Sequence, residues 1–403
     1  GGGGAGRGGG GWGAGVDVGA RAAALGGQWR RLHYQLGGVD PAAMLVEWER
    51  RLRAEALIRV HLGVEVRSVR GGPGAYRSEL GDGERIWEEE HGVLILATGG
   101  RPVEVGEYLY GEHPAVLTQR ELEGVLASRG AAGLADVETV VMVQCVGSRE
   151  PGRSYCSRVC CSQAVKNALK IKELKPEVGV YILYREVRTY GFREGWYQAA
   201  REAGVVFLRY EWPRKPEVRA DGEKVVVRLV EEVTGQEVEV RAERLVLSVG
   251  VEAEREEGLA RELGVEGEEG GFYREEQVKM KPLDLGGGLF VAGLARGPCA
   301  LEEAIEQGQG AAMRAAVWMA GGELREAATA VWVNERLCSF CGLCVEACPY
   351  GARRMNEEER VAEVVYPLCR GCGVCAVVCP NKATQQKTLE PVQLFATLEM
   401  ALT

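Results

Sequence analysis

Two stretches decide the fold of the C-terminal part of this chain: Cys338-Ser-Phe-Cys341-Gly-Leu-Cys344-Val-Glu-Ala-Cys348-Pro349 and Cys369-Arg-Gly-Cys372-Gly-Val-Cys375-Ala-Val-Val-Cys379-Pro380. Both follow the pattern C-x2-C-x2-C-x3-C-P. Thiolates at this spacing can each reach a different iron of one [4Fe–4S] cubane, and the fourth cysteine of each run reaches the other cubane. The spacing predicts one cluster on Cys338, Cys341, Cys344 and Cys379, and a second on Cys348, Cys369, Cys372 and Cys375.

The residues around these cysteines favour iron–sulfur clusters over structural zinc. Zinc sites rarely use eight thiolates in this arrangement, and a proline after the fourth cysteine is typical of ferredoxins. The glycines at 342, 371 and 373 allow tight turns and leave backbone amides free to bond cluster sulfur. We expect each fourth cysteine to begin a helix. Together these features predict a bacterial-type ferredoxin domain with two [4Fe–4S] clusters.

Four more cysteines form a group near the middle of the chain, in Gln144-Cys145-Val-Gly-Ser148-Arg149 and Tyr155-Cys156-Ser-Arg-Val-Cys160-Cys161. They follow a predicted strand and open a predicted helix, whose N-terminus would stabilise thiolates. Adjacent cysteines cannot point the same way from regular structure, so a redox-active disulfide and a cluster of unusual geometry fit the spacing equally well. Cys299 stands alone, and we expect it to be a small buried apolar residue.

Composition excludes several classes of protein. The 403 residues are 46% hydrophobic and 27% charged, with a formal net charge of -9 and no basic face for nucleic acid. No apolar run approaches the roughly 18–20 residues of a membrane helix, and no secretory signal is evident. Most of the 13 cysteines lie in tight groups, which favours metal ligation in a reducing compartment over disulfide bonds. We expect a soluble cytoplasmic protein.

Strands alternate with helices before the cysteine-rich region, which predicts an α/β fold with a parallel sheet. Helices are expected at 41–57, 162–174, 301–320 and 391–402. Strands are expected at 58–62, 64–69, 75–80, 86–88, 93–98, 139–143, 178–184, 245–249 and 289–292. Gly1, Gly3 and Gly6 satisfy the phosphate-binding pattern G-x-G-x-x-G, and Gly26 and Gly27 follow.

Several segments resemble the A-type subunit of heterodisulfide reductase. They are the middle cysteine segment, Leu25-Gly-Gly-Gln-Trp29, Ala97-Thr-Gly99, Gly111-Glu-His-Pro114 with Thr118-Gln119, and Val291-Ala-Gly-Leu-Ala-Arg-Gly-Pro298. The resemblance implies a thioredoxin-reductase-like flavoprotein core that binds FAD, followed by the ferredoxin domain. It also implies that Cys145, Cys156, Cys160 and Cys161 hold a third [4Fe–4S] cluster beside the flavin. The implied FAD contacts are Gly1, Gly3, Gly6, Gly26, Gly27, Gln28, Trp29, Ala97, Thr98, Gly99, Gly293, Leu294, Gly297 and Pro298.

The resemblance divides the chain into four parts. Residues 1–135 and 245–330 form the two halves of the FAD-binding domain. Residues 136–244 form an inserted nucleotide-binding-like domain that carries the middle cysteines, and residues 331–403 form the ferredoxin domain with a C-terminal helix. The chain lacks the additional ferredoxin insert of long family members.

Some positions depart from related flavoproteins. A second glycine fingerprint should follow the strand at 139–143, but Gln144-Cys145-Val-Gly147 stands there, so no nicotinamide pocket is expected. Residues 19–24 contain no acidic residue for the adenosine ribose, and Leu294 follows Gly293 where Asp is common. Because no nicotinamide pocket is expected, electrons should arrive and leave through the iron–sulfur clusters.

The sequence thus predicts an oxidoreductase subunit in which FAD converts between two-electron and one-electron transfers, with electron bifurcation as a hypothesis. Implied partners are subunits similar to heterodisulfide reductase B and C, a hydrogenase- or dehydrogenase-linked input subunit, ferredoxin and a second copy of the chain. The alternatives are a subunit of a quinone-linked membrane complex and a non-catalytic iron–sulfur scaffold. No catalytic residue is assigned.

Three lesser candidates lie near the expected flavin. His33 would line the flavin or a phosphate, or lie in a basic surface loop, with equal weight. Lys166 is more simply a solvated helix charge than a residue near the flavin. The helix after Pro298, with Glu303, Gln307 and Gly308, would aim its N-terminus at the flavin ring.

Overall fold

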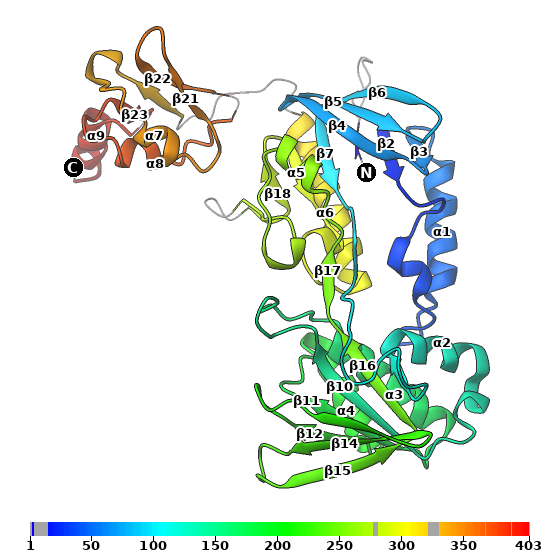
Figure 1. Cartoon of the computed structure of the whole chain (residues 1–403). Helices are drawn as coiled ribbons and strands as arrows, with labels where there is room; N and C mark the ends of the chain where they lie inside the picture. Colours follow the sequence, from blue (N-terminus) through cyan, green and yellow to red (C-terminus); the bar gives the residue numbers. More distant parts are fainter. Residues whose placement is uncertain are drawn as a thin grey trace.

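The computed structural model describes residues 2–3, 15–276, 281–320, 330–366, 368–387 and 389–402. Figure 1 shows two α/β units, one above the other, and a smaller module at the side of the upper unit. None of the helices in the described part of the chain combines the length and apolar character needed to cross a membrane.

The upper unit is built on a six-stranded sheet. Its strand order is β18 (Asp284–Gly286), β19 (Leu289–Val291), β7 (Val93–Leu96), β1 (Gly2–Gly3), β2 (Val16–Ala20) and β3 (Ile58–Leu62). β19 runs parallel to β7, and β2 runs parallel to β3. The carboxyl ends of neighbouring parallel strands lie at one sheet edge, which is where α/β proteins bind ligands.

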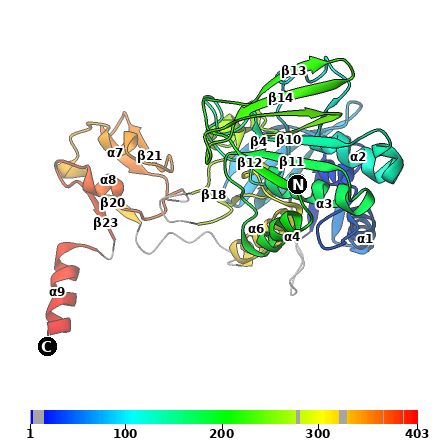
Figure 2. The same cartoon turned by 90° about the horizontal axis from the view of Figure 1, so that it is seen from below.

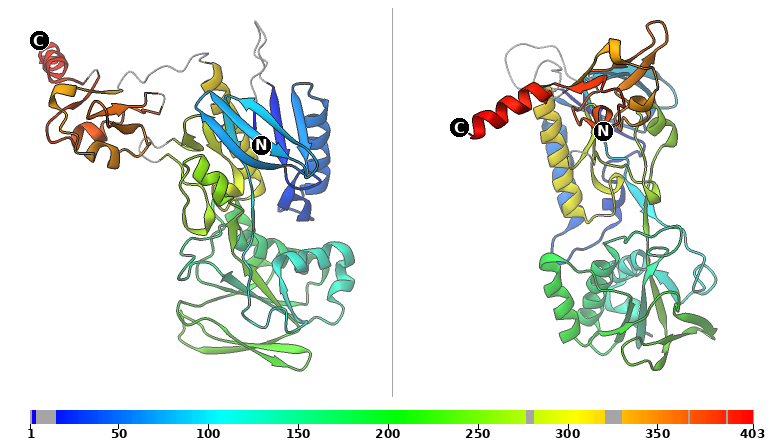
Figure 3. Two further views of the ribbon diagram at one scale, coloured as in Figure 1. Left: turned by 45° about the horizontal axis from the view of Figure 1, so that its top comes forward. Right: turned by 90° about the vertical axis from the view of Figure 1, so that its left-hand side faces the viewer.

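Two helices and a small second sheet complete the upper unit. Helix α1 (Pro41–Ala54) contacts β3, and helix α6 (Leu301–Ala320) contacts β7 and β19; Figure 3 shows the two helices on opposite sides of the unit. The second sheet is a meander of β4 (Glu65–Gly72), β5 (Ala75–Gly81) and β6 (Ile86–His91). The short helix α5 (Glu257–Glu262) packs on β4.

The lower unit has a five-stranded, all-parallel sheet. Its order is β12 (Val206–Arg209), β11 (Gly179–Tyr184), β10 (Thr139–Val146), β16 (Arg244–Val249) and β9 (Val116–Thr118). Its helices are α2 (Gln119–Arg129), α3 (Cys160–Leu174) and α4 (Glu194–Glu202). The meander β13 (Glu217–Asp221), β14 (Lys224–Val230) and β15 (Glu237–Ala242) covers the other face.

The central strand β10 shows why this sheet forms. Val140, Val141, Met142 and Val143 are all fully buried, and side chains alternate between the two faces of a strand. Val140 and Met142 accordingly pack in the core with the helices, while Val141 and Val143 pack against the meander. A continuous apolar run of this kind is typical of a parallel strand that is covered on both sides.

The two units are joined by two adjacent connections. The chain leaves the upper unit after β8 (Gly100–Pro102) and returns through β17 (Val251–Ala253), and these two strands pair antiparallel. Gly250 is needed here because a Cβ at this position would lie 2.7 Å from the backbone oxygen of Gly147. The turn at Gly147, two residues after Cys145 of β10, therefore packs directly against the returning connection.

The described part of the small module contains two short antiparallel sheets of two strands each and two one-turn α-helices. β20 (Val331–Val333) pairs with β23 (Thr384–Gln386), and β21 (Arg353–Asn356) pairs with β22 (Val361–Val364). Helices α7 (Leu343–Glu346) and α8 (Val374–Val377) each follow a glycine in the left-handed region, Gly342 and Gly373. Helix α9 (Pro391–Leu402) extends away from the module (Figure 2).

Most predicted elements form, although one prediction is wrong. Helices α7 and α8 begin just before the third cysteine of each run and end before the fourth, so Cys348 and Cys379 do not begin helices. The reason is the left-handed glycine, which starts the helical turn two residues before the third cysteine. Helix α1 ends at Ala54, three residues earlier than predicted, and α2, α4 and the meander β13–β15 were not predicted.

We expect Leu126→Ala to destabilise the chain by about 2–5 kcal/mol, because it removes a buried side chain and leaves a cavity between α2 and β10. Leu126 is 2% exposed, and Leu402 on α9, at 86% exposed, provides the matched control. Denaturant unfolding of both variants measures the difference. Equal midpoints for Leu126→Ala and Leu402→Ala would contradict this packing.

Candidate functional site

The first cysteine set of the small module surrounds a cavity. Cys338, Cys341, Cys344 and Cys379 line it together with Thr384 and Ala362. These are three cysteines of the first run and the last cysteine of the second run, which is the crossed arrangement that the spacing predicts. Four converging thiols around a small enclosed space are suited to a cubane.

The second set also comes together. Burial, with a contribution from the nearby thiols of Cys348, Cys372 and Cys369 and against the opposing Arg353 guanidinium, raises the pKa of Cys375 to about 11. Such thiols resist ionisation unless a cation neutralises them. Iron supplies that charge when it binds, and ligation would deprotonate all four.

The middle set lies where β10 meets α3. Cys145 ends β10 with a positive φ of 62°, and Cys160 and Cys161 are the first residues of α3. The neighbouring Cys160 thiol lowers the pKa of Cys161 to about 7 against the opposing effect of burial, and the backbone and charge of Arg188 act in the same direction. Burial raises the pKa of Cys145 to about 11, and the charges of Cys161 and Cys156 add to this.

Several polar atoms beside the middle cysteines are buried without a partner among the described residues. They are Oε1 and Nε2 of Gln144, Nη1 of Arg149, Oγ of Ser162 and Nε of Arg185. Buried polar groups are normally hydrogen-bonded. Unsatisfied donors around four thiols fit a bound group that carries negative sulfur, as a cluster does.

The predicted flavin contacts lie at the carboxyl ends of the upper sheet. Ala97, Thr98 and Gly99 follow β7, and Gly293 follows β19, where the Ala292 N–H donates to the Leu96 oxygen at 3.0 Å. Gly99 and Gly293 have φ of 88° and 66°. The buried Thr98 hydroxyl has no partner among the described residues, which fits a cofactor that accepts or donates a hydrogen bond there.

Other predicted contacts have protein partners or lie elsewhere. Gly26 and Gly27 both have positive φ and start the turn Gly27–Arg31, in which Gln28 accepts a hydrogen bond from Arg120 and Trp29 donates one to the Pro41 oxygen. Gly3 lies in strand β1, which pairs with β2 and β7. Gly1 and Gly6 lie outside the described residues.

The middle cysteine loop is fastened to the loop that precedes α6. Arg158 lies between Cys156 and Cys160, and its Nη1 donates to the Pro298 oxygen at 3.1 Å. The same guanidinium pairs with Glu303 on α6 at 3.4 Å and stacks over Tyr190. Leu294, Gly297 and Pro298 belong to this loop, and Gln307 of α6 accepts from the Gly293 N–H at 3.0 Å.

Lys166 provides a second connection, and its prediction as a solvated charge is wrong. It is only 6% exposed, and its Nζ lies 2.7 Å from Oε2 of Glu123, which is fully buried. It also donates to the Tyr34 backbone oxygen at 2.9 Å. The other Glu123 oxygen accepts from the His33 backbone N–H at 2.8 Å. Helix α3 is thus tied to the loop after the Gly26–Gly27 turn.

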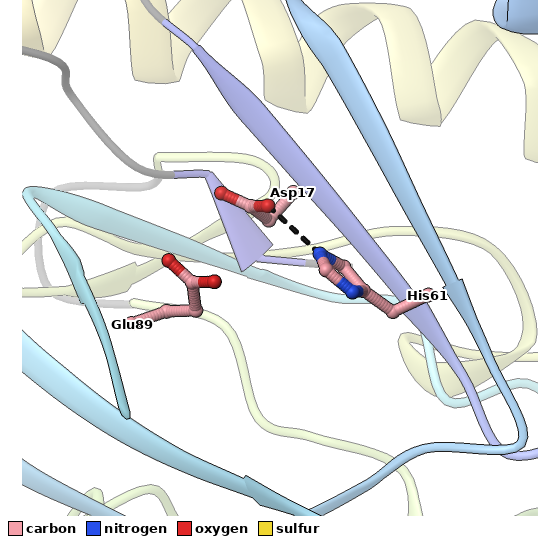
Figure 4. A group of neighbouring side chains, drawn as sticks. All are labelled: Asp17, His61 and Glu89. Atoms are coloured by element: carbon pink, nitrogen blue, oxygen red, sulfur yellow. Dashed lines mark hydrogen bonds and ion pairs between the residues drawn. The ribbon is translucent and has the colours of Figure 1, made fainter. Parts of the chain in front are cut away.

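A further titratable group lies on the outer strands of the upper unit. Figure 4 shows Asp17, His61 and Glu89 pointing toward one another from β2, β3 and β6, with potential ligand atoms within 4.8 Å. Arg59 Nη2 already donates to Asp17 at 2.7 Å and to Glu89 at 3.2 Å. The cluster has its own cation and is explained as an ion-pair network. Because Asp17 is already bonded to Arg59 and His61, we do not assign to it the role of the missing acidic residue that would bond the adenosine ribose.

Known proteins match this chain in both sequence and fold. The 4Fe–4S binding domain family model matches residues 331–354. The A-type subunit of H(2):CoB-CoM heterodisulfide,ferredoxin reductase from Methanothermobacter marburgensis is 37% identical over 78% of this chain and 50% of its own length. An A-type iron-sulfur subunit of CoB–CoM heterodisulfide reductase from Methanopyrus kandleri is 36% identical over 68% of this chain and 44% of its own length. The chain therefore spans about half the length of these relatives.

A solved structure supports the fold. Thioredoxin reductase of T. acidophilum superposes with a TM-score of 0.50, covering 77% of this chain and 91% of its own, at 16% sequence identity. The predicted fold class, a thioredoxin-reductase-like flavoprotein core followed by a ferredoxin domain, is confirmed.

We expect Cys156→Ser to lower the iron content of anaerobically isolated protein by about one cubane, from about twelve irons to about eight. Cys299→Ser is the control, since Cys299 is a buried cysteine outside the three sets. Iron and sulfide analysis of the two variants decides the matter. Unchanged iron in Cys156→Ser would remove this residue from the ligand set.

We expect Lys166→Met to cost about 3–5 kcal/mol of unfolding free energy, because Glu123 would remain buried without its cation. The double variant Lys166→Met with Glu123→Gln should recover most of that loss, since no uncompensated charge stays in the interior. Denaturant unfolding of the single and double variants gives the comparison. Additive losses would show that the pair is not coupled.

Proposed function

Because this chain belongs to the family of A-type heterodisulfide reductase subunits, we propose that it is the FAD- and iron–sulfur-containing electron-transfer subunit of a larger oxidoreductase complex. The flavoprotein fold and the 4Fe–4S family match support the two kinds of cofactor. Bound FAD would supply exchange between paired and single electrons, and the clusters carry one electron each.

The observation that carries the proposal is the attachment of the middle cysteine loop to the flavin side of the upper unit. Arg158 holds the loop of Cys156 and Cys160 to Pro298, and Lys166 holds helix α3 to the backbone of Tyr34. Two independent contacts therefore fix the middle set relative to the predicted flavin contacts. A cluster on Cys145, Cys156, Cys160 and Cys161 would exchange electrons with the flavin directly.

Contacts of the ferredoxin module suggest an order for its clusters. The Tyr350 hydroxyl, two residues after Cys348, donates to Oε1 of Glu276 in the upper unit at 2.6 Å. Arg370, next to Cys369, lies against the Gly286–Gly287 turn, with Nη2 3.7 Å from the Cβ position of residue 286. The set with Cys348 and Cys369 thus faces the core. The other set contains the exposed Cys341 and would exchange electrons with a partner.

The partners in this proposal are redox subunits that perform the terminal reactions. The Methanopyrus kandleri relative is named as a subunit of CoB–CoM heterodisulfide reductase, and the Methanothermobacter marburgensis relative as a subunit of H(2):CoB-CoM heterodisulfide,ferredoxin reductase. By this family relationship, the partners would be subunits similar to heterodisulfide reductase B and C, an electron-input subunit, and ferredoxin. A second copy of the chain within the complex remains part of the proposal.

A reductive titration under strictly anaerobic conditions tests the function. We expect about five electrons per chain, two for FAD and one for each of three clusters. Bifurcation, the finer proposal, predicts that the flavin absorbance falls in one two-electron step, whereas two separate one-electron steps would contradict it. Metal and flavin analysis is the control. Zinc in place of iron, or no flavin, would overturn the whole proposal.

A further inference from the structure

A buried arginine lies between the two cysteine sets of the ferredoxin module. Arg353 begins β21 and is only 4% exposed. Its Nη2 donates to the Cys344 sulfur at 3.3 Å and to the Thr384 hydroxyl at 3.1 Å. Cys375 of the second set packs in the same buried cluster as Cys344. The guanidinium that bonds Cys344 therefore lies beside a core that holds a thiol of each set.

The guanidinium is incompletely satisfied by the protein. Nε and Nη1 of Arg353 have no hydrogen-bond partner among the described residues, and no carboxylate of those residues forms an ion pair with it. Cys344, which it bonds, belongs to an apolar cluster that also contains Val331, Ala362 and Cys375. A buried charge with open donors is costly unless another group accepts its hydrogen bonds and balances its charge.

We propose that Arg353 is a cation shared by the two clusters of the ferredoxin module, hydrogen-bonding cluster sulfur and raising the reduction potential of both. The inference rests on the proposed function, since it requires that both cysteine sets hold clusters. Reduced clusters carry more negative charge on their sulfurs than oxidised ones. The two open N–H groups supply donors for that charge at the boundary between the sets.

The direction of the effect follows from electrostatics. Adding one electron to a cluster raises its negative charge by one, and a fixed positive charge in a low-dielectric interior stabilises the added charge. No proton has to move, because arginine stays protonated throughout. The charge compensation is therefore already in place before the electron arrives.

The two clusters should feel the cation unequally. Arg353 bonds Cys344 directly, and Thr384, which accepts from Arg353, lines the same cavity as Cys379 of that set. The second set is linked to Arg353 less directly, through the packing of Cys375 in the cluster that contains Cys344. The cluster on Cys338, Cys341, Cys344 and Cys379 should depend more strongly on Arg353.

The test compares Arg353→Met with Arg353→Lys in the full chain, and with Arg354→Met as the surface control. Arg354 is the next residue, with a side chain that is 71% exposed and paired with Glu363. Iron and sulfide content is measured first, and the potential of each cluster is then followed by electron paramagnetic resonance. The wild-type iron content reports on the proposed function independently, because a wild type without clusters fails that function before the arginine is tested.

We expect Arg353→Met to disfavour reduction of the first cluster by about tenfold, which is about 59 mV for one electron, with a smaller shift at the second. Arg353→Lys should stay closer to wild type, and Arg354→Met should match it. Full iron with unchanged potentials in Arg353→Met would overturn the proposal. Should that variant lose iron, Arg353→Gln takes its place. Iron loss in both neutral variants would assign Arg353 to cluster assembly, which also overturns it.

Discussion

Crowded thiols in an apolar interior are the constraint on which the rest of this structure depends. In the middle set the thiols of Cys161 and Cys156 add to the burial that raises the pKa of Cys145, and in the ferredoxin module Cys348, Cys372 and Cys369 do the same for Cys375. Packing several thiolates together is unfavourable when no metal is bound, because their negative charges repel one another. Bound iron would make the same packing favourable, because each thiolate then coordinates a positive ion. Nearby polar side chains with unsatisfied hydrogen-bond donors, such as Gln144, Arg149 and Arg353, would stabilise the negative charge of bound clusters. In the proposed function, the positions of these cysteine sets would therefore determine the path that electrons take.

The same balance of charge appears at the contacts between the structural units. Arg158 joins the middle cysteine loop to the flavin side, and Lys166 with Glu123 joins helix α3 to the loop after the Gly26–Gly27 turn. Both are charged side chains placed where two units meet beside a cofactor site. These polar contacts on the cysteine-bearing side add to the paired strands β8 and β17, which link the two units. In the proposed function, these contacts would hold the middle cysteine set at a fixed distance from the flavin.

Sequence patterns predicted most of what is local and little of what is set by tertiary packing. The crossed grouping of Cys338, Cys341, Cys344 and Cys379 could be foreseen because ligand spacing encodes it, and the buried strands because apolar runs mark them. The depth of Lys166 could not, since its partner Glu123 lies on another helix and neither residue stands out alone. Arg353 and Arg158 were missed for the same reason. The domain boundaries, the ligand roles of individual cysteines and the number of clusters stay predictions.

The exchange of a fourth cysteine between the two runs has a consequence for how the module is made. Cys379 completes the cavity of the first run, so that cavity does not exist until the chain has folded as far as its last strands. Metal binding is part of the folding free energy of such small domains. In the predicted grouping, Cys348 of the first run likewise completes the set of Cys369, Cys372 and Cys375, so neither set of four would be complete until most of the module has been synthesised.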